Sequence, residues 1–238
     1  MSPPGDIVLR LEGVAAAWSE GGAEALRGVD LALRAGTFHY LVGPSGAGKT
    51  TLLRVMSLSL PARRGRILLF GRDVALAERG ELAALRRRIG VVFQDFRLLE
   101  HLSVFDNVAL PLRIAGLDED RIAEVVGEML AWVGLGALAE APPGQLSMGQ
   151  RQLVAIARAV VGRPQILLAD EPLSNLDPRR AERIMYLFGE LHRLGTTVVL
   201  ATHNMELLRR FPHPLLVLED GRLVAAGGEA RVAAGAQA

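Results

Sequence analysis

The chain has 238 residues, a formal net charge of +1 and no cysteine, and half of its residues are hydrophobic. This length can bury a sizeable core, whereas the lack of cysteine excludes disulfides and thiol chemistry, and the balanced charge gives no indication of a nucleic-acid partner. Because no segment is apolar enough to span a bilayer and the first residues lack a secretory signal, we expect a soluble, cytoplasmic chain.

Short strands are predicted in the part of the chain before Asp95, with one helix among them. Apolar runs and period-two alternation place these strands at 7–11, 29–33, 37–42, 66–70 and 89–93. A glycine-rich turn and a helix that begins at Lys49 lie between residues 42 and 66. This order of strand, loop and helix is typical of phosphate-binding loops.

The pattern turns helical from about Asp95 to Gly162. Apolar residues recur at a spacing of three and four between Ile122 and Val133, and Ser147 begins a second long helix. Beyond Gly162, continuous apolar strands at 165–170 and 196–203 indicate a mostly parallel sheet that is buried on both faces. A helix that begins after Asp177 separates them, and Asp220-Gly221 predicts a hairpin near the end.

The segment from Gly43 to Thr50 fits the pattern G-x-x-x-x-G-K-[ST]. Its glycines let successive backbone N–H groups and the following helix face the phosphates of a nucleotide. Lys49 is the only lysine among 27 Lys and Arg residues, because a tight phosphate cradle needs a compact ammonium and not a planar guanidinium. The predicted nucleotide-binding residues are Gly43, Pro44, Ser45, Gly46, Ala47, Gly48, Lys49, Thr50 and Thr51.

Two carboxylates follow the apolar run that ends at Ala169. Asp170 and Glu171 stand at the end of a strand, where open α/β sheets bind their ligands. We expect Asp170 and the Thr50 hydroxyl to hold Mg²⁺, and Glu171 to polarise the attacking water beside the γ-phosphate. ATP and Mg²⁺ are therefore the predicted cofactors.

These motifs, together with "LSMGQ" at 146–150, "SNLD" at 174–177, Gln94 and His203, resemble the nucleotide-binding subunit of ABC transporters over about residues 7–225. The resemblance implies an α/β fold, the ABC cassette of P-loop NTPases, with a mostly parallel sheet core, an antiparallel N-terminal β subdomain and an α-helical lobe. It also implies one domain, with a nucleotide-binding core at 1–94 and 163–226, a helical lobe at 95–162 and a tail at 227–238.

The same resemblance implies roles for residues that the sequence by itself does not explain. Trp18 takes the position of the aromatic residue that stacks on adenine, Gln94 that of the glutamine that meets Mg²⁺ and water, and His203 that of the histidine that donates to the γ-phosphate. Catalysis is thus assigned to Glu171, His203, Gln94 and Lys49, and Mg²⁺ binding to Thr50, Gln94 and Asp170.

The resemblance further implies a homodimer that forms on ATP. In the family, the residues that match Ser147, Gly149 and Gln150 close over the nucleotide of a second copy. Met148 departs from the glycine that is usual in the middle of this signature, and Leu173 departs from the usual threonine. Met148 therefore leaves open a clamp that binds ATP and dimerises but hardly hydrolyses it.

Within the family, residues 91–116 and the "NLD" of the later loop most resemble the FtsE type of cell-division ATPase. This type acts with the membrane protein FtsX at the cytoplasmic face of the inner membrane to control cell-wall hydrolysis. ATPases of lipoprotein-releasing and macrolide-type exporters are the alternative. In either case a short apolar helix of an integral membrane partner is expected to bind between the two lobes, at Phe93–Leu102 and Leu110–Ile114.

Overall fold

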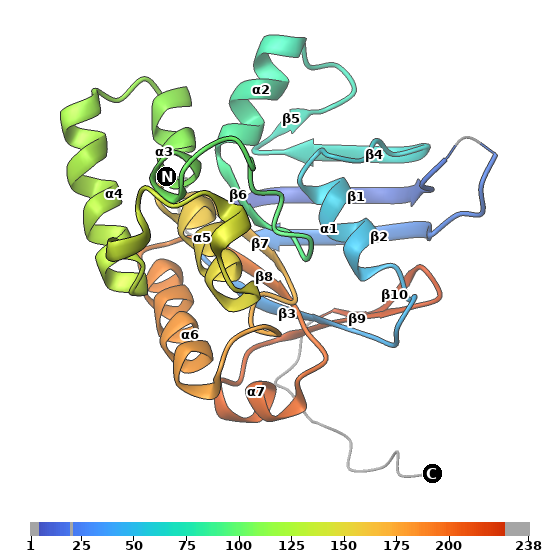
Figure 1. The fold of residues 1–238 in the computed structure, drawn as a ribbon. Coiled ribbons are helices and arrows are strands. Elements are labelled where there is room, and N and C mark those ends of the chain that lie inside the picture. Colours follow the sequence, from blue (N-terminus) through green and yellow to red (C-terminus); the bar gives the residue numbers. More distant parts are fainter. Residues whose placement is uncertain (1–4, 20, 227–238) are drawn as a thin grey trace.

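The computed structural model describes residues 5–19 and 21–226, so the predicted tail at 227–238 lies outside the described residues. Two sheets and the helices around them make up the fold (Figure 1). The strands are β1 Ile7–Ala16, β2 Leu26–Arg34, β3 Phe38–Val42, β4 Arg64–Leu69, β5 Arg72–Asp73, β6 Ile89–Val92, β7 Ile166–Asp170, β8 Thr197–Ala201, β9 Leu215–Glu219 and β10 Arg222–Ala226. The α-helices are α1 Lys49–Met56, α2 Arg79–Arg87, α3 Val104–Ile114, α4 Glu119–Val133, α5 Met148–Val160, α6 Pro178–Arg193 and α7 Met205–Arg210.

The two sheets differ in direction. The 4-stranded sheet has the order β2-β1-β4-β5 and is antiparallel throughout. The 6-stranded sheet has the order β10-β9-β3-β8-β7-β6, and all of its neighbours are parallel except the β9–β10 hairpin. Both the predicted antiparallel subdomain and the predicted parallel core are therefore present.

The 6-stranded sheet lies between two hydrophobic clusters, because successive side chains of a strand point to opposite faces. In β7, Leu167 and Ala169 pack into a cluster with α3, α4, α5 and α6, whereas Ile166 and Leu168 pack into a cluster with α1 and the antiparallel sheet. Every residue of β7 and β8 is buried, as the apolar runs predicted. The division into a core and a helical lobe stays a prediction.

Two sequence expectations are wrong. Helix α2 was not predicted, because it is rich in charged residues and only Leu85 among its residues is buried. The helical region does not begin at Asp95 but at Val104, since residues 93–103 form a loop in which Phe96 and Arg97 have left-handed backbones. Among the helices of the described ranges 5–19 and 21–226, we find no candidate for a membrane-spanning segment.

Gly90 is the point at which β6 and α5 pack most closely. A Cβ at this position would lie 2.1 Å from the carbonyl oxygen of Ala159. We therefore expect Gly90→Ala to lower the free energy of unfolding by about 3 kcal/mol, because α5 must move away from the sheet. Gly127 lies in α4 with open space around it, so Gly127→Ala should instead raise stability by about 0.5–1 kcal/mol. Urea unfolding measures both, and equal effects would contradict the packing argument.

His213 is half-buried in a cluster of aromatic and imidazole rings. Its ring stacks on Phe38 at a centroid distance of 3.9 Å and lies edge-on to His192. Burial, with smaller contributions from the charges of His192 and His39, lowers the pKa of His213 from 6.5 to about 4. The folded state therefore binds this proton less readily than the unfolded state, so stability is complete above pH 6.5 and falls as the pH is lowered towards about 4.

We expect this loss to amount to about 1–2 kcal/mol once the partial exposure of the ring is allowed for. His213→Phe keeps a ring against Phe38 and should flatten the pH dependence in this window. His101 is exposed, so His101→Gln should leave the dependence as it is. Urea titrations at several pH values measure the free energy of unfolding. If this free energy depended on pH in His213→Phe as it does in the wild type, the interpretation would be contradicted.

Candidate functional site

The predicted phosphate loop joins β3 to α1, and its backbone permits only glycine at two points. Gly43 and Gly48 have φ values of 153° and 102°. A Cβ on Gly43 would lie 2.0 Å from the carbonyl oxygen of Leu218, and one on Gly48 would lie 2.6 Å from that of Ala25. Helix α1 begins at Lys49 without a side-chain cap from the described residues, so its first N–H groups face the loop and can bind an anion.

The Lys49 ammonium is folded back across this loop. Its Nζ donates to the carbonyl oxygens of Gly43 at 2.7 Å and Pro44 at 2.9 Å. A guanidinium is wider and planar and would not fit between these two carbonyls in the same way. The lysine therefore places one positive charge at the centre of the loop, in front of the start of α1.

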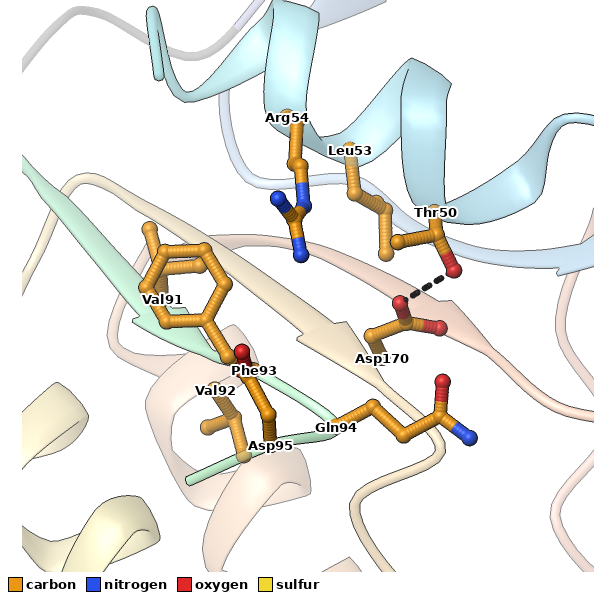
Figure 2. A pocket seen from close by; sticks show the side chains of 9 residues that line it. All are labelled: Thr50, Leu53, Arg54, Val91, Val92, Phe93, Gln94, Asp95 and Asp170. Atoms are coloured by element: carbon orange, nitrogen blue, oxygen red, sulfur yellow. Dashed lines mark hydrogen bonds between the residues drawn. The ribbon is translucent and has the colours of Figure 1, made fainter. Parts of the chain in front are cut away.

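Thr50 and Asp170 bring oxygen ligands together beside the loop (Figure 2). The Thr50 hydroxyl donates to Asp170 Oδ2 at 2.6 Å, and Gln94 lines the same cavity of about 160 Å³. Burial raises the pKa of the Asp170 carboxyl, and the neighbouring Glu171 charge adds to this, so a cation here would favour the ionised form. Hydroxyl, carboxylate and amide oxygens suit Mg²⁺.

A metal at this point would also need ligands from the bound molecule. Across residues 5–19 and 21–226, no group of three His, Cys, Asp or Glu side chains is placed to hold a metal ion. Mg²⁺ commonly takes one or two protein oxygens and completes its shell with phosphate and water. The donor set of Thr50, Asp170 and Gln94 therefore fits a metal that arrives with a nucleotide.

Glu171 and His203 form a second pair at the ends of β7 and β8. His203 Nδ1 lies 2.7 Å from Glu171 Oε1. Glu171 has a left-handed backbone, with φ of 47°, and its N–H donates to the Ala201 carbonyl. Such a conformation is uncommon outside glycine. The imidazole is exposed while the carboxylate is largely covered, so His203 forms the solvent side of the pair.

One cavity of about 480 Å³ connects the two pairs to the loop and to Trp18. Nearly all of its lining was predicted from the sequence, and Ala25 is the exception. Its lining residues are Trp18, Ala25, Gly43, Ser45, Gly46, Gly48, Lys49, Thr50, Thr51, Gln94, Asp170, Glu171 and His203. Ala47, which was also predicted to bind nucleotide, has a buried side chain, and its N–H donates to the Pro44 carbonyl within the loop.

Ser147, Gly149 and Gln150 are not among the residues that line this cavity. They begin α5, where Ser147 and Gln150 form a capping box, each side chain accepting from the backbone of the other. Gly149 leaves room for the Asn175 carbonyl, which would lie 2.8 Å from an added Cβ. Met148 is 56% exposed beside them. This helix start is thus a separate surface of the chain.

Arg158 holds the loop that follows Gln94, and this role was not predicted from the sequence. Its guanidinium donates to the carbonyl oxygens of Phe96 and Arg97, each at 2.7 Å, and both of these residues have left-handed backbones. Burial lowers the pKa of Arg158. The fully buried Asn107 holds the next part of the loop through Leu99. An arginine in the last turn of a helix gives no sequence signal for contacts so distant in the chain.

Comparisons with known proteins agree with this geometry. The family model described as "ABC transporter" matches residues 26–174. The methionine import ATP-binding protein MetN of Xylella fastidiosa is 46% identical over 204 residues, which are 85% of this chain and 61% of MetN. The cell division ATP-binding protein FtsE of Escherichia coli is 44% identical over 216 residues, which are 91% of this chain and 97% of FtsE. The chain therefore spans less than two thirds of that MetN and nearly all of FtsE.

Solved structures give the same result for the fold. A dimeric post-hydrolysis state of the ATP-binding cassette MJ0796, bound to ADP and Pi, superimposes with a TM-score of 0.85 at 34% identity and covers 91% of this chain and 97% of that one. A second dimeric structure of this cassette gives the same TM-score of 0.85. The predicted cassette fold is confirmed.

Arg158 should be needed for the order of the loop beyond Gln94. We expect Arg158→Gln to lower the free energy of unfolding by about 2 kcal/mol, because two loop carbonyls, one of them partly buried, lose a charged donor. The change should also increase amide hydrogen exchange at residues 95–99 more than elsewhere. Arg193 lies exposed on α6, and Arg193→Gln serves as the control. A uniform rise in exchange over the whole chain would contradict a local role for Arg158.

Proposed function

This chain belongs to the ABC transporter family, and from this membership we propose that it binds and hydrolyses ATP as the nucleotide-binding subunit of a membrane complex. The observation that carries the proposal is the single cavity that the phosphate loop, the Thr50–Asp170 pair and the Glu171–His203 pair share. Each of these groups has a different task in phosphoryl transfer to water, and the cavity is large enough for a nucleotide.

Binding rests on the loop and on Trp18. The backbone N–H groups of the loop, the start of α1 and the Lys49 ammonium bind the β- and γ-phosphates. Trp18 is 53% exposed at the cavity edge and offers a ring face to the adenine. Thr50, Asp170 and Gln94 would hold Mg²⁺, which neutralises phosphate charge when it is bound.

Hydrolysis rests on Glu171 and His203. Glu171 orients the attacking water and accepts its proton, and His203 donates a hydrogen bond to the γ-phosphate. The 2.7 Å contact between the two side chains keeps both at the open end of β7 and β8. Gln94 lines the same cavity from the end of β6 and would contact both the metal and the water.

The active unit is a dimer of this chain. Ser147, Gly149 and Gln150 form a helix start that does not line the chain's own cavity, so a second copy supplies the nucleotide that they cover. The similar cassette was solved as a dimer, which supports this arrangement. The exposed Met148 supports the second candidate function, an ATP-gated clamp that hydrolyses slowly, because a side chain there can crowd the covered phosphate.

The membrane partner binds the groove between β6, α3 and α5. A cavity of about 390 Å³ is lined there by apolar residues, among them Phe93, Leu99, Leu110 and Pro111, with Arg87 and Arg97 at its edge. Such a groove accepts the apolar face of a short helix. The proposed place of the chain is therefore the cytoplasmic face of the inner membrane, where it is peripheral.

We assign the chain to the FtsE type, with an integral membrane protein of the FtsX type as its partner. The sequence of residues 91–116, six of which line this groove, and the identity of 44% to FtsE of Escherichia coli support the assignment. Methionine import is the competing role, because MetN of Xylella fastidiosa is 46% identical. Lipoprotein-releasing and macrolide-type export remain the alternatives from the sequence.

The proposal is tested with Lys49→Ala and Glu171→Gln. Lys49→Ala should weaken ATP binding at least about tenfold, because it removes the charge that faces the phosphates. Glu171→Gln should keep ATP affinity, slow phosphate release about 100-fold or more and accumulate an ATP-bound dimer. Calorimetry, phosphate release and light scattering measure the three quantities, with the exposed Glu190→Gln as control.

Phosphate release is then measured with the chain incorporated beside an FtsX-type or a methionine-import membrane subunit. Stimulation by the FtsX-type protein alone supports the division role, and stimulation by the import subunit alone overturns it. If Lys49→Ala bound ATP with the affinity of the wild type, the assignment of the nucleotide site to this loop would be wrong. If neither the wild type nor Glu171→Gln released phosphate with either partner, the chain would act as an ATP-gated clamp and not as a hydrolase.

A further inference from the structure

We propose that Arg54 is a positioning residue for ATP binding, which holds one face of the Trp18 ring so that the other face is preset to stack on the purine. This inference rests on the proposed function and adds to it a residue outside the nucleotide-binding motif. It concerns the base end of the nucleotide, whereas Lys49, Thr50 and Asp170 act on the phosphate end.

Two contacts hold the Trp18 side chain against α1. The indole Nε1 donates to Thr51 Oγ1 at 3.1 Å, and the Arg54 guanidinium carbon lies 4.5 Å from the ring centroid. Thr51 is only 3% exposed, so the hydrogen-bond acceptor is itself fixed in the core. The first contact fixes the edge of the indole and the second covers one of its faces, which together leave a single orientation.

Both contacts come from the helix that carries Lys49. Thr51 and Arg54 are three residues apart, and residues at this spacing lie on one side of a helix. The same helix, α1, therefore positions both the Trp18 ring, on which the base would stack, and the loop that would bind the phosphates. Trp18 itself lies in the loop after β1 and is 53% exposed, so without these contacts its ring would have many orientations available.

A guanidinium is suited to this task. It is planar, always charged and weakly hydrated, and it stacks on an indole with an attraction that a neutral side chain lacks. Figure 2 shows that the Arg54 side chain extends from α1 into the cavity that Thr50 and Asp170 also line. Trp18 lines the nucleotide cavity, so the face that Arg54 leaves uncovered is the one available to the base.

The position of Arg54 predicts a selective effect. Stacking depends on the base and is tolerant of which purine is present, whereas inorganic tripolyphosphate contains no base at all. Arg54→Gln should weaken Mg²⁺-ATP binding about threefold to tenfold and weaken Mg²⁺-tripolyphosphate binding much less. Arg54→Lys keeps the charge but loses the planar stack, and should lie between the wild type and Arg54→Gln.

The chain contains a matched control for this contact. Arg183 lies over Trp132 at the same distance of 4.5 Å, on the α4–α6 surface. Arg183→Gln should therefore change neither affinity. Since the chain has 2 tryptophans, Trp132→Phe leaves Trp18 as the only indole fluorophore, and in that background Arg54→Gln should shift Trp18 emission to the red. Thermal unfolding of each variant confirms that it is folded.

The outcomes separate this inference from the proposed function. Equal weakening of ATP and tripolyphosphate by Arg54→Gln would show that Arg54 acts on the phosphate end, and unchanged ATP affinity with unchanged Trp18 emission would show that it does not position the ring. Either result overturns the inference while the wild type still binds ATP. If instead the wild type binds neither ligand and Lys49→Ala has no effect, the proposed function fails first.

Discussion

The candidate site depends on one steric constraint, the close approach of the phosphate loop to two backbone carbonyls. The space that a side chain would need at Gly43 is taken by the Leu218 carbonyl of β9, and at Gly48 by that of Ala25 before β2. The loop is thus pinned between the two sheets as it turns into α1. Because α1 starts at a fixed point, Lys49, Thr50, Thr51 and Arg54 all take their positions from this contact.

The second half of the site depends on the register of parallel strands. Asp170, the last residue of β7, pairs with Ala201, the last residue of β8, so the residues that follow each strand emerge side by side. Glu171 and His203 meet there although they are 32 residues apart in the sequence. The left-handed backbone of Glu171 then separates its carboxylate from that of Asp170, so one faces Thr50 and the other faces His203.

The features that could be predicted from the sequence are those with a regular apolar pattern or a fixed motif spacing. Buried strands such as β7, the glycine loop and the cap at Asp177 each follow from local chemistry, and they were found at the expected places. Helix α2 was not predicted because it is rich in charged residues and only Leu85 among its residues is buried. The contacts of Arg54 and Arg158 were not predicted either, for a different reason. Each joins a helix to a loop that is distant in sequence, and nothing in the neighbouring residues marks either arginine as an anchor.

Helix α5 joins the two surfaces that the proposed function requires. Its 13 residues span about 20 Å, with the capped start at Ser147 at one end and Arg158 near the other. At the first end Met148 is exposed, and at the second the guanidinium holds the strained carbonyls of Phe96 and Arg97, directly after Gln94. Helix α5 thus connects the exposed start at Ser147 with the loop that lines the partner groove, because Arg158 contacts that loop directly.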